Sequence, residues 1–106
     1  MMTSKNKVAL ITGSTSGIGL GIAHVLAADG YHIVLNGFGD AAEIEKTRND
    51  IESRFGVKAI FAEADVTNYD SVAAMIAKAE AALGSVDIIV NNAGVQFVSL
   101  VEDFPL

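Results

Sequence analysis

The stretch that decides the fold is Thr12-Gly13-Ser14-Thr15-Ser16-Gly17-Ile18-Gly19, which follows the apolar run Val8–Ile11 and leads into a segment of helical period. Gly13 permits a tight turn, Gly17 lets the backbone approach a pyrophosphate, and Gly19 lets a helix pack close to a strand. The N–H groups of the first helical turn and the positive end of the helix dipole then face a bound phosphate, and the hydroxyls of Ser14, Thr15 and Ser16 can donate to its oxygens. The stretch thus predicts a phosphate-binding turn, with an ordinary Gly/Ser-rich turn as the simpler alternative.

Short apolar runs alternate with segments of helical period along the rest of the chain. Runs of consecutive apolar residues are typical of strands buried on both faces, and they occur at 8–11, 33–35, 59–61 and 88–90. Three helices are predicted between these strands, each with an apolar face, ending at Asp29-Gly30, at Gly56 and at Gly84.

The spacing of apolar residues predicts how the helices face the core. In the first helix Ile18, Ile22, Val25 and Leu26 recur at helical spacing, so this stripe is expected to face the sheet. The second helix is expected to begin at about Asp40 and the third at Asn68 or a near neighbour, because these side chains cap helices well.

Strands that alternate with helices predict an α/β fold with a doubly wound parallel sheet of the Rossmann type. Right-handed crossovers give the strand order 3-2-1-4, with the first two helices on one face and the third on the other. The order reverses between the first and fourth strands, and ligands of such sheets bind there, at the carboxyl ends of the strands.

Length and composition limit the functions that the chain can have. A chain of 106 residues with one Pro and a net charge of −6 is expected to form one domain, 1–106. The absence of Cys excludes disulfides and thiolate metal sites, and no metal site is predicted. The acidic balance argues against nucleic acid and anionic membranes as partners. The first apolar run is too short for a signal peptide or a transmembrane span, so a cytoplasmic protein is expected.

A second glycine-rich stretch, 37–42, also lies between a strand and a helix and fits a G-x-G-x-x-A pattern. It follows the second strand, away from the point where the strand order reverses, and Asp40 would repel a phosphate there. We therefore expect it to flank the adenosine end of a cofactor. Asn36 occupies the position where an acid often selects NAD, and no Lys or Arg occurs between Gly13 and Glu45, so NAD is favoured over NADP.

Polar residues also follow the third and fourth strands. Asp65 is expected to accept a hydrogen bond from the adenine amino group while Val66 covers the ring; the alternative is that Asp65 caps the next helix. In Asn91-Asn92-Ala93-Gly94, the amides are expected to bridge neighbouring strands, and Gly94 leaves room for the nicotinamide ribose. Without the glycine loop nearby, such an Asn pair would indicate only a turn.

The glycine loop together with Asn91-Asn92-Ala93-Gly94 resembles the short-chain dehydrogenase/reductase family over the whole chain. Within that family the sequence is most similar to the bacterial D-3-hydroxybutyrate dehydrogenases in the stretches 13–22, 35–45 and 95–105. The resemblance implies NAD as cofactor, a 3-hydroxy acid as substrate, a homotetramer, and a substrate-carboxylate contact at Gln96. It also implies NAD contacts at Thr15, Ile18, Phe38, Asp65, Val66, Asn92 and Gly94. Together with the glycine loop, the predicted cofactor site is Gly13, Ser14, Thr15, Ser16, Gly17, Ile18, Gly19, Phe38, Asp65, Val66, Asn92, Ala93 and Gly94.

No residue of this chain matches the catalytic Tyr-x-x-x-Lys pair of that family, because Leu35 and Ala73 stand four residues after Tyr31 and Tyr69. The strand at 88–90 would also form an apolar edge with no Lys or Pro to guard it. We therefore expect an N-terminal, cofactor-binding part of a longer enzyme, which is inactive alone. The resemblance implies that the whole enzyme interconverts D-3-hydroxybutyrate and acetoacetate. A 3-oxoacyl reductase and a non-catalytic nucleotide-binding module are the alternatives.

Overall fold

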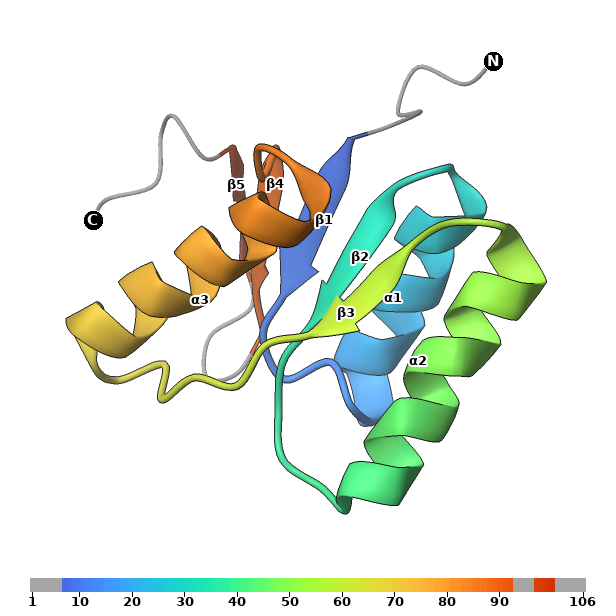
Figure 1. The fold of residues 1–106 in the computed structure, drawn as a ribbon, viewed down its shortest axis with the longest axis horizontal. Helices are drawn as coiled ribbons and strands as arrows, with labels where there is room; N and C mark the ends of the chain where they lie inside the picture. Colours follow the sequence, from blue (N-terminus) through green and yellow to red (C-terminus); the bar gives the residue numbers. More distant parts are fainter. Residues whose placement is uncertain (1–6, 93–96, 101–106) are drawn as a thin grey trace.

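The computed structural model describes residues 7–92 and 97–100 of the chain. Strands and helices alternate as the sequence predicts, and their ends lie within a residue or two of the predicted positions (Figure 1). The elements are β1 (Val8–Ile11), α1 (Gly17–Ala28), β2 (His32–Leu35), α2 (Ala41–Phe55), β3 (Ala59–Phe61), α3 (Tyr69–Leu83), β4 (Ile88–Asn91) and β5 (Phe97–Leu100).

The sheet has the strand order β3-β2-β1-β4-β5, and its first four strands are parallel. Leu10 at the centre of β1 lies opposite Val34 of β2 and Ile89 of β4. The predicted order 3-2-1-4 is confirmed. The chain builds outward from β1 through β2 to β3 and then returns past β1 to β4, so the reversal lies between β1 and β4.

The fifth strand changes the expected picture of the sheet edge. β4 is not an edge strand, because β5 pairs with it in the antiparallel sense, with Val90 opposite Val98. A parallel neighbour needs a crossover of about a dozen residues or more, whereas only residues 92–96 separate β4 from β5. The short connection therefore allows only an antiparallel return of the chain.

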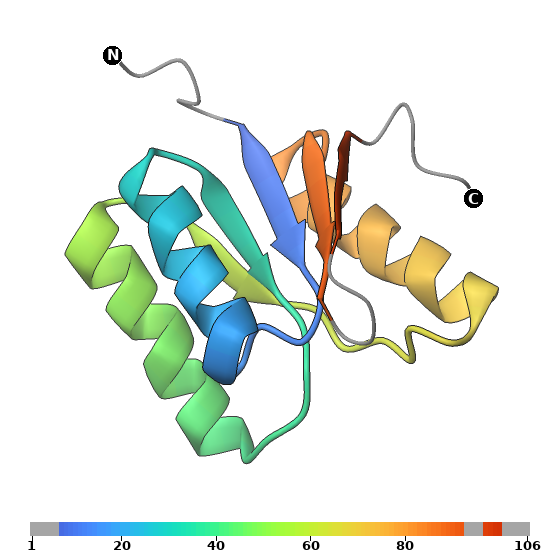
Figure 2. The same ribbon diagram turned by 180° about the vertical axis from the view of Figure 1, so that it is seen from behind.

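Helices cover both faces of the sheet, as expected. Figures 1 and 2 show α1 and α2 on one face and α3 on the other. Successive residues of β1 alternate between the two cores: Ala9 and Ile11 pack on the α1 and α2 side, while Val8 and Leu10 pack on the α3 side. All four are fully buried, which explains why the strand is apolar at consecutive positions.

The predicted inward face of α1 is right for Ile22 and Leu26, which are partly buried and pack against the core, but wrong for Ile18 and Val25. Ile18 and Val25 are 68% and 69% exposed, and the buried residues of the helix are instead Gly19, Ala23 and Ala27. Small residues at intervals of four let the helix axis lie close to the sheet, a position that larger side chains would prevent. The apolar stripe of α1 therefore borders an open groove against β4, lined by Ile18, Gly21, Ile22, Val25, Leu26, Ile88 and Val90.

None of the helices in the described part of the chain is long and apolar enough to span a membrane.

Candidate nucleotide-binding site

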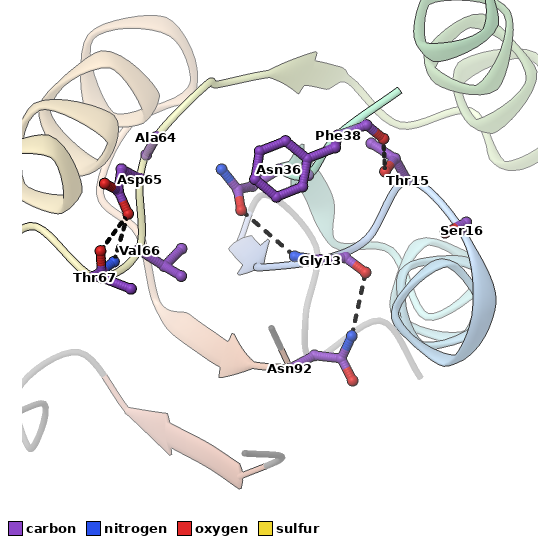
Figure 3. A pocket seen from close by; sticks show the side chains of 11 residues that line it. Gly13, Thr15, Ser16, Asn36, Phe38, Ala64, Asp65, Val66, Thr67 and Asn92 are labelled. Carbon is purple, nitrogen blue, oxygen red and sulfur yellow. Dashed lines mark hydrogen bonds between the residues drawn. The ribbon is translucent and has the colours of Figure 1, made fainter. Parts of the chain in front are cut away.

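A cavity of about 490 Å³ lies at the carboxyl ends of the four parallel strands, where the strand order reverses (Figure 3). Each of these strands contributes residues to it through the segment that follows the strand. The lining residues are Gly13, Thr15, Ser16, Asn36, Gly37, Phe38, Ala64, Asp65, Val66, Thr67 and Asn92. The sequence predicts the location of this cavity, because parallel strands bring these segments to one edge of the sheet.

The three glycines of the loop have different structural roles. Gly13 and Gly17 have positive φ angles of 62° and 61°, which favour glycine. A Cβ atom on Gly19 would lie 2.1 Å from the Gly13 carbonyl oxygen and 2.6 Å from Nδ2 of Asn92. A Cβ atom on Gly17 would meet no atom of the described residues outside its own helix and chain neighbours within 4 Å. Gly19 therefore allows α1 to pack against the loop, and no described residue fills the space at Gly17.

The N-terminus of α1 differs from those of the other two helices. Asp40 accepts hydrogen bonds from the N–H groups of Ala42 and Glu43 at the start of α2, and Asn68 accepts one from Ser71 at the start of α3. Ser16, at the start of α1, makes no such side-chain bond, and the first turn of α1 contains no acidic residue. The positive end of this helix is thus available to an anion from the cavity.

The Ser14 hydroxyl does not face the cavity as the sequence suggests. Ser14 is fully buried; its hydroxyl donates to the Ile11 carbonyl at 2.7 Å and accepts from the Asn36 N–H at 3.0 Å. It therefore joins the end of β1 to the end of β2. Nothing in the sequence indicates that this hydroxyl points inward, because serines that bind a phosphate occur in the same kind of loop.

Asn36 lines the cavity, but its side-chain amide is bonded to the neighbouring strand ends. Only 2% of the residue is exposed, and its side-chain amide donates to the Ala62 carbonyl at 3.0 Å. Its Oδ1 accepts a long hydrogen bond from the Gly13 N–H at 3.5 Å. Asn36 thus holds together the ends of three neighbouring strands at the cavity.

Thr15 and Phe38 link the glycine loop to the loop after β2. The Thr15 hydroxyl donates to the Phe38 carbonyl at 2.7 Å, and the Phe38 residue is 94% exposed. In Figure 3 the Phe38 ring points from its loop into the space between Thr15 and the segment at 64–67. The sequence predicts both residues as site residues, but it gives no sign of the bond between them.

The predicted bridging role of the Asn pair at the end of β4 is confirmed, most fully for Asn92. Its side-chain amide donates to the Gly13 carbonyl at 3.2 Å, and its backbone N–H donates to the Thr12 hydroxyl at 2.9 Å. Oδ1 of Asn91 lies 3.3 Å from the same Thr12 hydroxyl. These contacts fix the end of β4 to the glycine loop across the point where the strand order reverses.

Asp65 and Val66 both line the cavity, and Asp65 is not the helix cap. Its Oδ1 accepts hydrogen bonds from the Thr67 hydroxyl at 2.6 Å and from the Thr67 N–H at 2.9 Å, whereas α3 is capped by Asn68. These bonds lower the pKa of the Asp65 carboxyl below its usual value, with the hydroxyl as the larger cause. The Asp65 carboxyl is therefore ionised at neutral pH. The spacing Asp-x-Thr is a turn signature that identifies Thr67 as part of the site.

Several predicted residues have other placements. Ala93, Gly94 and Gln96 lie outside the described residues. Ile18 is exposed at the start of α1 and does not line the cavity. Within 7–92 and 97–100 there is no cluster of three or more His, Asp or Glu side chains that could hold a metal ion.

Comparisons with known proteins agree on a family. The model of the short chain dehydrogenase family matches residues 7–105. D-beta-hydroxybutyrate dehydrogenases from Rhizobium meliloti and Cupriavidus necator are 48% and 47% identical over 94% and 93% of this chain. A 3-oxoacyl-acyl-carrier-protein reductase from Staphylococcus epidermidis is 40% identical over 85% of it. The chain spans 39%, 38% and 36% of the lengths of these three relatives.

A solved structure supports the same assignment. L-sorbose reductase from Gluconobacter frateurii, in complex with NADPH and L-sorbose, superposes with a TM-score of 0.78 at 35% identity. The alignment covers 98% of this chain and 39% of that protein. Both the sheet with its cavity and the matched sequence therefore lead to the same conclusion: this chain belongs to the short-chain dehydrogenase family.

Proposed function

We propose that this chain is the cofactor-binding part of an NAD-dependent oxidoreductase that interconverts D-3-hydroxybutyrate and acetoacetate. The observation that carries the choice of substrate is the identity of 48% and 47% to two D-beta-hydroxybutyrate dehydrogenases across nearly the whole chain. The relatives are more than twice as long as this chain, so the catalytic residues are proposed to lie elsewhere in the whole protein.

Different parts of the cavity match different parts of a dinucleotide. Its volume of about 490 Å³ is within the range of small-molecule sites. The uncapped N-terminus of α1 and the open space before Gly17 would accept the pyrophosphate. On the other side of the cavity, Phe38 and Val66 offer apolar surface to the adenosine, and ionised Asp65 can accept from its amino group.

The charges around the site favour NAD over NADP. No Lys or Arg occurs between Gly13 and Glu45, which leaves a 2′-phosphate without a cationic partner in the segments after β1 and β2. The start of α2 is also closed to a phosphate, because Asp40 occupies its free N–H groups. The related L-sorbose reductase was solved with NADPH, so membership of the family does not by itself decide between the two cofactors.

Residues after β4 are proposed to complete the nicotinamide end. Asn92 reaches the cavity, and Ala93 and Gly94 follow it in the sequence. Gln96 is proposed to bind the substrate carboxylate. The nicotinamide, when bound, supplies the hydride acceptor, while the chain described above holds and orients it. Assembly as a homotetramer belongs to the same proposal and rests on the resemblance alone, whereas the proposed location in the cytoplasm rests on the short first apolar run.

A 3-oxoacyl reductase is the second candidate, because a relative with that name is 40% identical over most of the chain. The two functions differ in the cofactor and in the size of the acyl substrate. A non-catalytic nucleotide-binding module is the third, since no residue of this chain matches the catalytic Tyr-x-x-x-Lys pair.

Steady-state assays of the whole protein distinguish the three. We expect NADH to form from NAD and D-3-hydroxybutyrate, much less turnover with the L-enantiomer, and weak activity with NADP. Faster reduction of an acetoacetyl thioester by NADPH would favour the 3-oxoacyl reductase. Binding of NAD with no turnover of either substrate would favour the non-catalytic module.

A further inference from the structure

Phe38 is an unusual surface residue. With 94% of it exposed, its ring gains nothing from the core, yet it lines the cavity together with Thr15 and Val66. A ring in such a position needs a structural restraint to favour one orientation, because an exposed loop residue otherwise samples several rotamers.

Thr15 restrains the backbone that carries this ring through two contacts. Its hydroxyl donates to the Phe38 carbonyl at 2.7 Å, and its side chain lies against the bare Cα of Gly37. A Cβ atom on Gly37 would be 2.6 Å from Oγ1 and 3.2 Å from Cγ2 of Thr15. Gly37 also has a positive φ of 152°. The absence of a side chain at position 37 therefore lets the loop after β2 lie directly on Thr15.

The hydroxyl of Thr15 has only one hydrogen, and the bond to Phe38 uses it. It is thus not free to donate to a phosphate oxygen in this arrangement. A threonine in a phosphate loop would ordinarily be assigned to the phosphate, but the geometry assigns its proton to the neighbouring loop.

From these contacts we propose that Thr15 is a positioning residue, which fixes Phe38 at the adenosine end of the site by holding the loop after β2 against the glycine loop. This inference rests on the proposed binding of NAD. Thr15 acts on the cofactor through Phe38, and Gly37 makes the contact possible.

A double-mutant cycle tests this indirect action. Thr15→Val removes the hydroxyl and keeps the shape, Thr15→Ser keeps the hydroxyl as the matched control, and Phe38→Ala removes the ring. NAD affinity is measured by calorimetry for the wild type, the three single variants and Thr15→Val combined with Phe38→Ala. We expect Thr15→Val to raise the Kd about three- to tenfold, the range for loss of one hydrogen bond, and Thr15→Ser to raise it less than about twofold.

The combined variant decides the mechanism. If Thr15 acts through Phe38, Thr15→Val should have less than about a twofold effect once Phe38 is alanine. Equal effects of Thr15→Val in both backgrounds would overturn the inference and indicate direct contact with the cofactor, and no effect in either background would also overturn it. Failure of the wild type to bind NAD would instead reject the proposed function, together with the inference that rests on it.

A measurement without cofactor examines the restraint itself. The amide nitrogen of Gly39 is bonded to the Phe38 carbonyl carbon, so its NMR chemical shift reports the hydrogen bond from Thr15. We expect the Gly39 amide resonance to move in Thr15→Val and to stay near the wild-type position in Thr15→Ser. Unchanged Gly39 resonances in both variants would contradict the bond on which the inference depends.

Discussion

The close contact of α1 with the glycine loop leads to a paired prediction at Gly19 and Gly21. Both glycines lie in the same helix, and alanine is ordinarily the better helix former by about 1 kcal/mol. A Cβ atom on Gly21 would meet no described atom within 4 Å, whereas one on Gly19 would lie 2.1 Å from the Gly13 carbonyl oxygen. The two substitutions should therefore change stability in opposite directions.

The size of the effect at Gly19 follows from the overlap. A carbon and an oxygen atom in contact need more than 3.0 Å, so the helix or the loop must move by on the order of 1 Å, which typically costs about 1–3 kcal/mol. The added carbon would also lie 2.6 Å from the Asn92 amide nitrogen and break its bond to Gly13, at a further cost of about 0.5–1.5 kcal/mol. After the gain in helix propensity, Gly19→Ala should destabilise by about 1–3 kcal/mol.

Urea unfolding followed by circular dichroism measures both changes on the same scale. We expect Gly21→Ala to raise the free energy of unfolding by up to about 1 kcal/mol and Gly19→Ala to lower it. Equal stabilities of the two variants would refute the reasoning, since they would show that α1 does not lie against the glycine loop and Asn92 as the structure has it.

Three further outcomes are expected. Ser14→Ala should cost about 1–3 kcal/mol in urea unfolding because it leaves the Asn36 N–H buried without its acceptor, while Ser16→Ala should change stability by less than about 0.5 kcal/mol; equal losses would contradict these placements. The hydrogen bond from the Ala59 N–H lowers the pKa of Glu52 in the folded protein. The Glu52 carboxylate therefore stabilises the fold at pH values above the pKa that Glu52 has in the unfolded chain. This stabilisation is lost as the pH falls through the pKa of Glu52 in the folded protein. Glu52→Gln should therefore lose less stability than the wild type between about pH 5 and pH 3, and parallel pH profiles would disprove this. In the whole protein, Gln96→Ala should raise the KM for D-3-hydroxybutyrate much more than the KM for NAD; similar increases in both would reject its proposed contact with the substrate.

The sequence was sufficient to predict the parallel sheet and the place of the cavity. Consecutive apolar residues such as Val8 and Leu10 indicate a strand buried on both faces, and the positions of glycines and capping residues define the helices. The strand order then follows from general rules of chain connection. These features depend on local patterns and topology, which a single sequence carries.

The remaining features depend on contacts between distant residues. Hydrophobic periodicity placed Ile18 and Val25 inward, but close packing selected the small residues Ala23 and Ala27 for the buried face. From the sequence, Ser14 and Asn36 are expected to face a ligand. In the structure the Ser14 hydroxyl accepts a hydrogen bond from the Asn36 N–H and so joins the ends of β1 and β2. No local pattern distinguishes a polar side chain that faces a cavity from one that satisfies buried backbone groups.

The central proposal is that a dinucleotide binds with its pyrophosphate at the uncapped N-terminus of α1, in front of Gly17. The most direct test is calorimetric titration of NAD into the wild type, Gly17→Val and Gly21→Ala. The Gly17 substitution adds a side chain toward the open space and strains a positive φ, whereas the Gly21 substitution leaves the cavity unchanged. We expect the Kd to rise at least about tenfold in Gly17→Val, equivalent to about 1.4 kcal/mol, and to stay within about twofold of the wild type in Gly21→Ala. An unchanged Kd in a folded Gly17→Val would contradict the proposed site.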